Sequence, residues 1–240
     1  MVPLRDENPT KITSYITYGL IAINVLVFLY EVTLSSPDLM TLFRTWAVVP
    51  EELTLSFQGN VPTTTVVREW LTLISAQFLH AGPLHLGGNM LYLWIFGNNV
   101  EEELGRFRFL LFYLVCGALA SLTQWYFGMF SEIPSLGASG AIAGVMGAYV
   151  FRFPTVRILT VVPLGFLFLP LRIPAIFYLG IWFLQQAAYG ITSLGVPTNV
   201  GMAAGGIAYW AHAGGFVFGM TLGPLLGLLD DTESLEEKDT

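Results

Sequence analysis

The stretch Ile173–Leu229 reads IPAIFYLGIWFLQQAAYGITSLGVPTNVGMAAGGIAYWAHAGGFVFGMTLGPLLGLL and contains 57 residues without a charged side chain. A helix needs about 20 apolar residues to cross the hydrocarbon core of a bilayer, so this stretch is long enough for two crossings. Its middle part, Gly195-Val-Pro-Thr-Asn199, contains turn residues that would end the first helix before the second begins. The stretch therefore predicts a membrane protein built from helices.

The composition of the whole chain agrees with this prediction. Of its 240 residues, 54% are hydrophobic and only 11% are charged, whereas a soluble domain is typically about 25% charged. This composition nearly excludes a water-soluble globule or a disordered chain. The net charge of −7 argues against nucleic acid as a partner. The single cysteine, Cys116, excludes an internal disulfide and a multi-cysteine metal cluster.

Further uncharged runs predict an all-α polytopic membrane protein with six transmembrane helices. These helices are expected at residues 14–34, 84–103, 106–127, 139–152, 173–192 and 205–229. The first is expected to be retained, because its length and acidic amino-terminal flank do not fit a cleaved signal peptide. The predicted divisions of the chain are an N-terminal segment at 1–13, one membrane domain at 14–229 and an acidic tail at 230–240.

The distribution of basic residues predicts the orientation in the membrane. Eight of the ten lysines and arginines fall on one side of the six predicted helices, and only Arg44 and Arg68 fall on the other. The positive-inside rule then places both termini in the cytoplasm. The segment of about 35–83 becomes an external loop, and it is apolar enough to lie against the membrane face.

His85 and Asn89 form the first polar pair within the predicted helices, where polar groups are costly in lipid. They are four residues apart, so they share one helix face near the external end of their helix. In that position they can point hydrogen-bond donors into a common cavity. An ordinary hydrogen bond between helices is the alternative explanation for this pair.

Ser139 opens the predicted helix at 139–152, between Gly137 and Gly140. The two glycines let another chain approach the serine hydroxyl closely, and the positive end of the helix stabilises a developing oxyanion. A serine at a helix start is more often only an N-cap. The motif Gly-Ala-Ser-Gly alone therefore leaves both interpretations open.

His212 lies in the last predicted helix, and a histidine within the membrane favours function over packing. Gly215 and Gly219 follow it by three and seven residues, so all three share one face that another helix can approach closely. The helices of Ser139 and His212 both enter from the external side. Their side chains are therefore expected at similar, shallow depths.

A hydroxyl, an imidazole that accepts its proton and an Asn–His donor pair are the parts of a serine hydrolase. Because no carboxylate lies in the stretch around His212, a Ser–His dyad is expected, with no metal or cofactor. A metalloprotease is excluded by the lack of His-Glu-x-x-His, and an aspartyl protease by the lack of an acid inside the spans. A transporter or channel stays open, although it would ordinarily need broken helices or charges along a path.

Four short motifs, in register over about residues 10–229, resemble those of the rhomboid intramembrane serine proteases. They are His85-x-x-x-Asn89-Met90, Val100-Glu101-x-x-Leu104-Gly105, Gly137-Ala-Ser139-Gly140 and Ala211-His212-x-Gly-Gly-x-x-x-Gly219. The resemblance implies a six-helix bundle with a water-filled cavity that opens outward. It also implies Ser139 as nucleophile, His212 as base, and His85 with Asn89 as oxyanion donors. The loop before the second helix resembles that family's membrane-lying first loop, and residues 194–204 resemble its cap over the active site.

Two positions depart from this family. Many relatives carry an aromatic residue one turn after the serine, where it stacks on the catalytic histidine, but this chain has Ala143. Tyr209, three residues before His212, is expected to supply the missing support, and the alternative is that Ala143 leaves the His212 ring loosely held. Some relatives also have Trp-Arg in the first loop, and Arg68-Glu69-Trp70 gives no clear match.

The resemblance implies an endopeptidase that cleaves transmembrane segments of other membrane proteins near their external end. Its expected partners are these substrates and the lipid bilayer. The expected location is a prokaryotic plasma membrane, with the active site opening to the non-cytoplasmic side. The main alternative is a non-catalytic membrane chaperone or retention factor of the same architecture, which would bind client helices in the same cavity.

Overall fold

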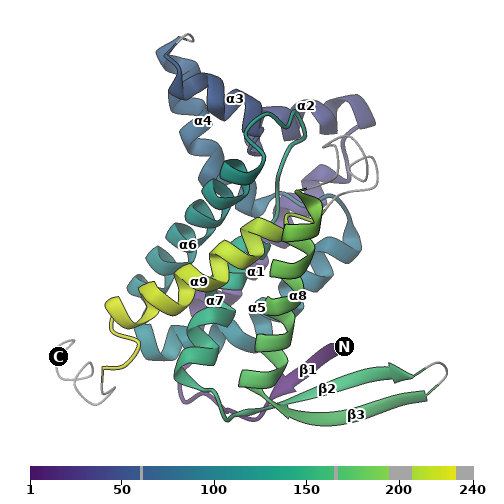
Figure 1. Ribbon diagram of the computed structural model, residues 1–240, viewed down its shortest axis with the longest axis vertical. Helices are drawn as coiled ribbons and strands as arrows, with labels where there is room; N and C mark the ends of the chain where they lie inside the picture. The colour runs from purple at the N-terminus through teal and green to yellow at the C-terminus, as the bar shows by residue number, and fades with distance from the viewer. Residues whose placement is uncertain (60–61, 165–166, 195–206, 231–240) are drawn as a thin grey trace.

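The computed structural model describes residues 1–59, 62–164, 167–194 and 207–230. Six long helices occupy the positions that the uncharged runs predict (Figure 1). They are α1 (Tyr15–Glu31), α5 (Pro83–Leu104), α6 (Arg106–Phe127), α7 (Ser139–Arg152), α8 (Ala175–Ser193) and α9 (Tyr209–Leu225). The predicted cap falls almost wholly outside the described residues, as does the acidic tail from residue 231 onward.

Length and hydropathy alone single out one of these helices. Within the described residues, α6 is long and apolar enough to cross a membrane, and α1 is a shorter apolar helix. The break between α5 and α6 is a single residue, Gly105, whose φ of +74° is a left-handed conformation that favours glycine. The two helices can therefore pair as antiparallel neighbours.

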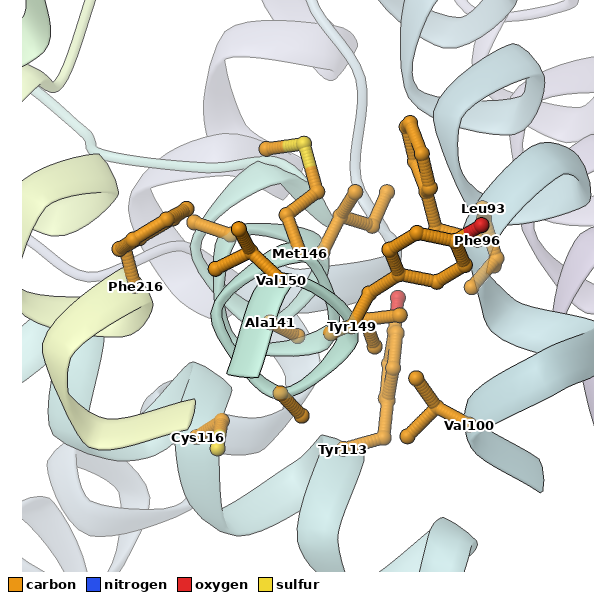
Figure 2. Close-up of a cluster of buried hydrophobic side chains, with 14 of the residues drawn as sticks. Leu93, Phe96, Val100, Tyr113, Cys116, Ala141, Met146, Tyr149, Val150 and Phe216 are labelled. Atoms are coloured by element: carbon orange, nitrogen blue, oxygen red, sulfur yellow. The ribbon is translucent and has the colours of Figure 1, made fainter. Parts of the chain in front are cut away.

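The central helix of the bundle is α7, which is buried from Gly140 to Val150. Side chains from α5, α6 and α9 surround it, as Figure 2 shows for Phe96, Tyr113 and Phe216. The rings of Phe96 and Tyr149 meet edge to face, with centroids 4.9 Å apart. Burial of α7 on all sides fixes the direction in which its first residue, Ser139, points.

Short helices form the loop between α1 and α5, and Figure 1 shows them gathered at one end of the bundle. They are α2 (Ser36–Trp46), α3 (Pro50–Phe57), α4 (Thr63–Ser75) and the 3₁₀ turn η1 (Ala76–Phe78). Backbone hydrogen bonds tie this loop to the segment that precedes α7. Val48 and Ser135 exchange N–H to carbonyl bonds of 3.0 and 2.7 Å, and the Gly137 N–H donates to the Ala76 carbonyl at 2.8 Å.

A three-stranded antiparallel sheet lies at the opposite end of the bundle (Figure 1) and departs from the all-helical fold predicted above. Its strands are β1 (Val2–Asp6), β2 (Arg157–Leu164) and β3 (Leu167–Pro174), in the order β1-β2-β3. The strand β1 pairs with a segment more than 150 residues away, as the register Val2 to Val161 shows. Such a distant partner is invisible to local sequence patterns, whereas β2 and β3 are neighbours in the sequence and their pairing was missed as well.

Carboxylates hold segments together at this same end. Glu101, at 0% exposure, accepts hydrogen bonds from the Ile16 N–H at 3.0 Å and from the N–H and hydroxyl of Thr17 at 2.7 Å each. These donors belong to the first turn of α1, where helix N–H groups have no partner within the helix. Glu101 therefore fixes the start of α1 against the last turns of α5.

Candidate active site

Ser139 and His212 are brought together by the packing of α7 against α9. The serine is the first residue of α7 and the histidine lies in the first turn of α9. His212 Nε2 is 2.8 Å from Ser139 Oγ, which is hydrogen-bond distance. The two residues lie 73 positions apart in the sequence, so tertiary packing alone creates this pair.

Glycines allow the two helices to approach so closely. A methyl group built on Gly215 would overlap the carbonyl of Gly140, and one on Gly219 would overlap the carbonyl of Gly144. The predicted supporting glycines Gly140, Gly215 and Gly219 therefore lie in one interface together with Gly144, where any larger residue would force the helices apart. A shift of this interface would separate the serine from the histidine.

His85 and Asn89 lie beside the segment that leads into Ser139. A methyl group on Gly137 would be 2.8 Å from His85 Nε2 and 3.7 Å from Asn89 Nδ2, so glycine is needed there to make room for both side chains. Gly137 also has a φ of +121°, which an L-amino acid rarely adopts. The two predicted donors and the serine segment thus share one small region.

His80 is a residue of this region to which the sequence pattern assigned no separate role. Its Nε2 is 3.0 Å from Asn89 Nδ2, and its backbone N–H donates to the Glu31 carboxylate at 3.1 Å. Burial, with a smaller contribution from the neighbouring His85, lowers the pKa of His80 to about 4. The neutral imidazole can therefore accept a hydrogen bond from one N–H of the Asn89 amide. The other N–H of the same amide then stays free for a ligand.

Two side chains of α8 contact the His212 ring. Gln186 Oε1 is 2.9 Å from His212 Nδ1. The Trp182 ring lies one helical turn earlier on the same face, with its centroid 5.7 Å from that of the imidazole and the planes 30° apart. Sequence reasoning missed both residues, although a glutamine within a predicted span was a signal, since polar groups there need a partner.

The support of His212 by Tyr209 stays a prediction. The Tyr209 ring packs against Tyr189, with centroids 5.2 Å apart, and the ring beside the imidazole belongs to Trp182. Ala143, which stands where many relatives carry an aromatic residue, is completely buried at 0% exposure. The side chains that contact the His212 ring thus come from α8. The sequence does not indicate which face of α8 turns toward α9.

The site's chemistry rests on neutral side chains. In the part of the chain that the structure describes, no group of three or more His, Cys, Asp and Glu side chains could hold a metal ion. The chemistry that the residues of the site can perform is proton transfer between a hydroxyl and an imidazole, next to amide and imidazole donors.

Comparison with known proteins identifies similar sequences. The family model described as Rhomboid domain matches residues 67–228. The chain is 39% identical to Rhomboid protease GluP of Bacillus subtilis over 136 residues, which cover 56% of this chain and 24% of that protein. It is 29% identical to Rhomboid protein 1, mitochondrial, of Saccharomyces cerevisiae over 214 residues, covering 87% of this chain and 52% of the yeast protein.

A second bacterial relative gives a similar result. Rhomboid protease AarA of Providencia stuartii is 26% identical over 168 residues, which cover 61% of this chain and 57% of that protein. The matched part of these relatives is thus between a quarter and about three fifths of their length.

Proposed function

Because the chain belongs to the rhomboid family, which consists of integral membrane proteins, we propose that it is an intramembrane serine endopeptidase. The proposed substrates are transmembrane segments of other membrane proteins, cleaved near their external end. The observation that carries the proposal is the 2.8 Å contact between His212 Nε2 and Ser139 Oγ. Relatives whose names contain "protease", GluP and AarA, support the same reaction class.

In the first step, Ser139 Oγ attacks the carbonyl carbon of the scissile peptide bond while His212 Nε2 takes the hydroxyl proton. The carbonyl oxygen becomes an oxyanion, held by the Ser139 backbone N–H at the start of α7 and by Asn89 and His85. When the C–N bond breaks, the imidazolium gives its proton to the leaving amine. Water, activated by the same imidazole, then hydrolyses the acyl-enzyme and restores the serine.

The proposed membrane arrangement follows the sequence. All six long helices are spans, both termini lie in the cytoplasm, and the site opens to the non-cytoplasmic side of a prokaryotic plasma membrane. The positions of α1 and α5 to α9 support the six spans, and the bacterial relatives support the location. Cysteine accessibility tests this orientation, since a cysteine in the α2–α4 loop is expected to react with an external membrane-impermeant reagent.

Labelling with a fluorophosphonate probe tests the activity. The purified wild type is expected to become labelled at Ser139, and Ser139→Ala is expected not to be labelled. Membrane-protein fragments released by cells with the wild type, and absent with Ser139→Ala, would then identify the substrates. An unlabelled wild type that still binds transmembrane helices would instead identify a chaperone or retention factor.

A further inference from the structure

Gln186 contacts the side of the His212 ring that faces away from the serine. The glutamine is largely buried, at 8% exposure, and its Oε1 is 2.9 Å from His212 Nδ1. On the other side of the ring, Nε2 is 2.8 Å from Ser139 Oγ. Serine, histidine and glutamine thus form one continuous chain of hydrogen-bonding groups across α7, α9 and α8.

The direction of this chain follows from the chemistry of a neutral imidazole. Such a ring carries one proton, either on Nδ1 or on Nε2, and the other nitrogen is an acceptor. An amide oxygen can only accept, so Gln186 Oε1 favours the proton on Nδ1. The lone pair of Nε2 then points at the Ser139 hydroxyl and can take its proton.

We propose that Gln186 is a positioning residue that sets the His212 tautomer and holds the ring toward Ser139. This inference rests on the proposed function. It adds that the Gln186 amide takes the place that a carboxylate has in a catalytic triad. The amide oxygen also faces Nδ1–H when the ring becomes an imidazolium, so its dipole stabilises that charge.

The competing explanation is that Gln186 only joins α8 to α9 as a packing hydrogen bond. That role would require a polar contact but would not affect which ring nitrogen carries the proton. The two explanations are therefore separated by a measurement on the imidazole itself.

Two acceptor-free variants, Gln186→Met and Gln186→Ala, and one acceptor-retaining variant, Gln186→Glu, test the inference. The matched control is Gln185→Met, since Gln185 is the exposed neighbour on the same helix. Its amide donates a hydrogen bond to the Tyr189 hydroxyl and not to His212. Turnover of a model transmembrane substrate is measured as kcat and KM separately. The thermal midpoint reports the stability of each variant.

The tautomer is read directly by ¹⁵N NMR of the full chain labelled at histidine. The chain has only three histidines, and the His212 signals are assigned by their loss in His212→Ala. The wild type is expected to show a protonated Nδ1 and an unprotonated Nε2. Gln186→Glu is expected to keep this pattern, and both acceptor-free variants are expected to shift part of the population to the other tautomer.

Turnover should follow the tautomer. Gln186→Met and Gln186→Ala are expected to lower kcat by about 10- to 100-fold with little change in KM, because a misplaced catalytic group costs rate steeply. Gln186→Glu should recover most of this loss and Gln185→Met should behave as wild type. Acceptor-free variants with unchanged kcat or an unchanged His212 spectrum would overturn the inference, whatever happens to their thermal midpoints.

The spectrum separates this inference from the proposed function. If the wild type proves unreactive toward the probe and substrates, but the His212 tautomer still depends on Gln186, the protease assignment fails and the positioning contact stands. If the wild type is an active protease whose His212 spectrum ignores Gln186, the protease assignment stands and the inference fails.

Discussion

The two ends of the helical bundle use polar groups in different ways. At the end with the sheet, carboxylates bind other segments: Glu101 holds the first turn of α1, and Glu103 pairs with Arg152 at 3.0 Å. At the end where α7 begins, a carboxylate also binds another segment, since Glu31 accepts a hydrogen bond from the His80 N–H, but the side chains around Ser139 are neutral and bind one another. His212 contacts both Ser139 and Gln186 at hydrogen-bond distances.

The carboxylates stabilise the fold, whereas the neutral groups can take part in a reaction. A buried carboxylate that accepts several hydrogen bonds is fixed in place, and its removal leaves donors unpaired. A neutral imidazole beside a hydroxyl can instead take the hydroxyl proton during the reaction. Changes at Ser139, His212 and their hydrogen-bond partners are therefore expected to affect turnover more than stability, and changes at the sheet end the reverse.

The largest effect is expected for the dyad. Ser139→Ala, His212→Ala and the double variant should each lose about 10⁴-fold or more in kcat and fall to a similar background, because residues that act as one unit have non-additive effects. Turnover of a model transmembrane substrate measures this loss. A His212→Ala variant with near-normal turnover would show that the base lies elsewhere.

Next in size is the loss of an oxyanion donor. Asn89→Ala is expected to lower kcat by about 10²–10³-fold, while the protein still reacts slowly with a fluorophosphonate. His85→Ala should act in the same direction. Asn98→Ala, at the other end of the same helix, is the control and should keep wild-type turnover. Wild-type rates for Asn89→Ala and His85→Ala would show that these side chains only form hydrogen bonds between helices.

The reverse pattern is expected for Glu101. Glu101→Ala leaves three donors of the first α1 turn without their acceptor, so it should lower stability by about 3 kcal/mol while the folded protein keeps its turnover. Thermal or denaturant unfolding in detergent measures the stability. Loss of kcat at full stability would contradict the division between the two ends.

His80 predicts a pH effect on stability. Burial and the neighbouring His85 lower its pKa from the ordinary 6.5 to about 4 in the folded protein, so the unfolded chain binds more protons between these values. The contribution of His80 to stability should therefore fall as pH falls from 6.5 to 4, by at most about 3 kcal/mol. Unfolding measured at both pH values should show a smaller fall in His80→Gln. An equal fall in both proteins would exclude His80 as its source.

The smallest effect concerns the aromatic support of His212. Trp182→Leu is expected to lower kcat by about 5-fold, as the loss of an aromatic contact of about 1 kcal/mol implies. Tyr209→Ala should change kcat less, because its ring packs against Tyr189. Ala143→Tyr should be overpacked and destabilised by about 1–3 kcal/mol, since Ala143 is fully buried. A damaging Tyr209→Ala beside an inert Trp182→Leu would instead support the role predicted for Tyr209.

The positions of the long helices could be predicted from the sequence to within a few residues. The helix predicted at 106–127 is α6, Arg106–Phe127, and the one at 139–152 is α7, Ser139–Arg152. Uncharged runs and the breaks between them are local properties, so a linear scan finds them. The place of β1 in the sheet was missed because its partner β2 comes from the other half of the chain.

Within the candidate site, residue types and their spacing along the chain are enough to point to Ser139, His212, Asn89 and His85. Each of these is a polar group in an apolar run, and such groups are costly in lipid unless they have a partner or a function. The sequence by itself thus determined the helices, the reactive groups and the glycines that permit close packing.

Only the tertiary structure decided which groups meet. Gln186 and Trp182 lie on α8, and neither the apolar composition of this helix nor the spacing of its residues shows which face turns toward α9. That face is set by the interlocking of side chains and glycines between helices, which depends on all the neighbouring helices at once. The partner of His212 Nδ1 and the ring beside the imidazole therefore came from packing, whereas Ser139 and His212 were already evident from the sequence.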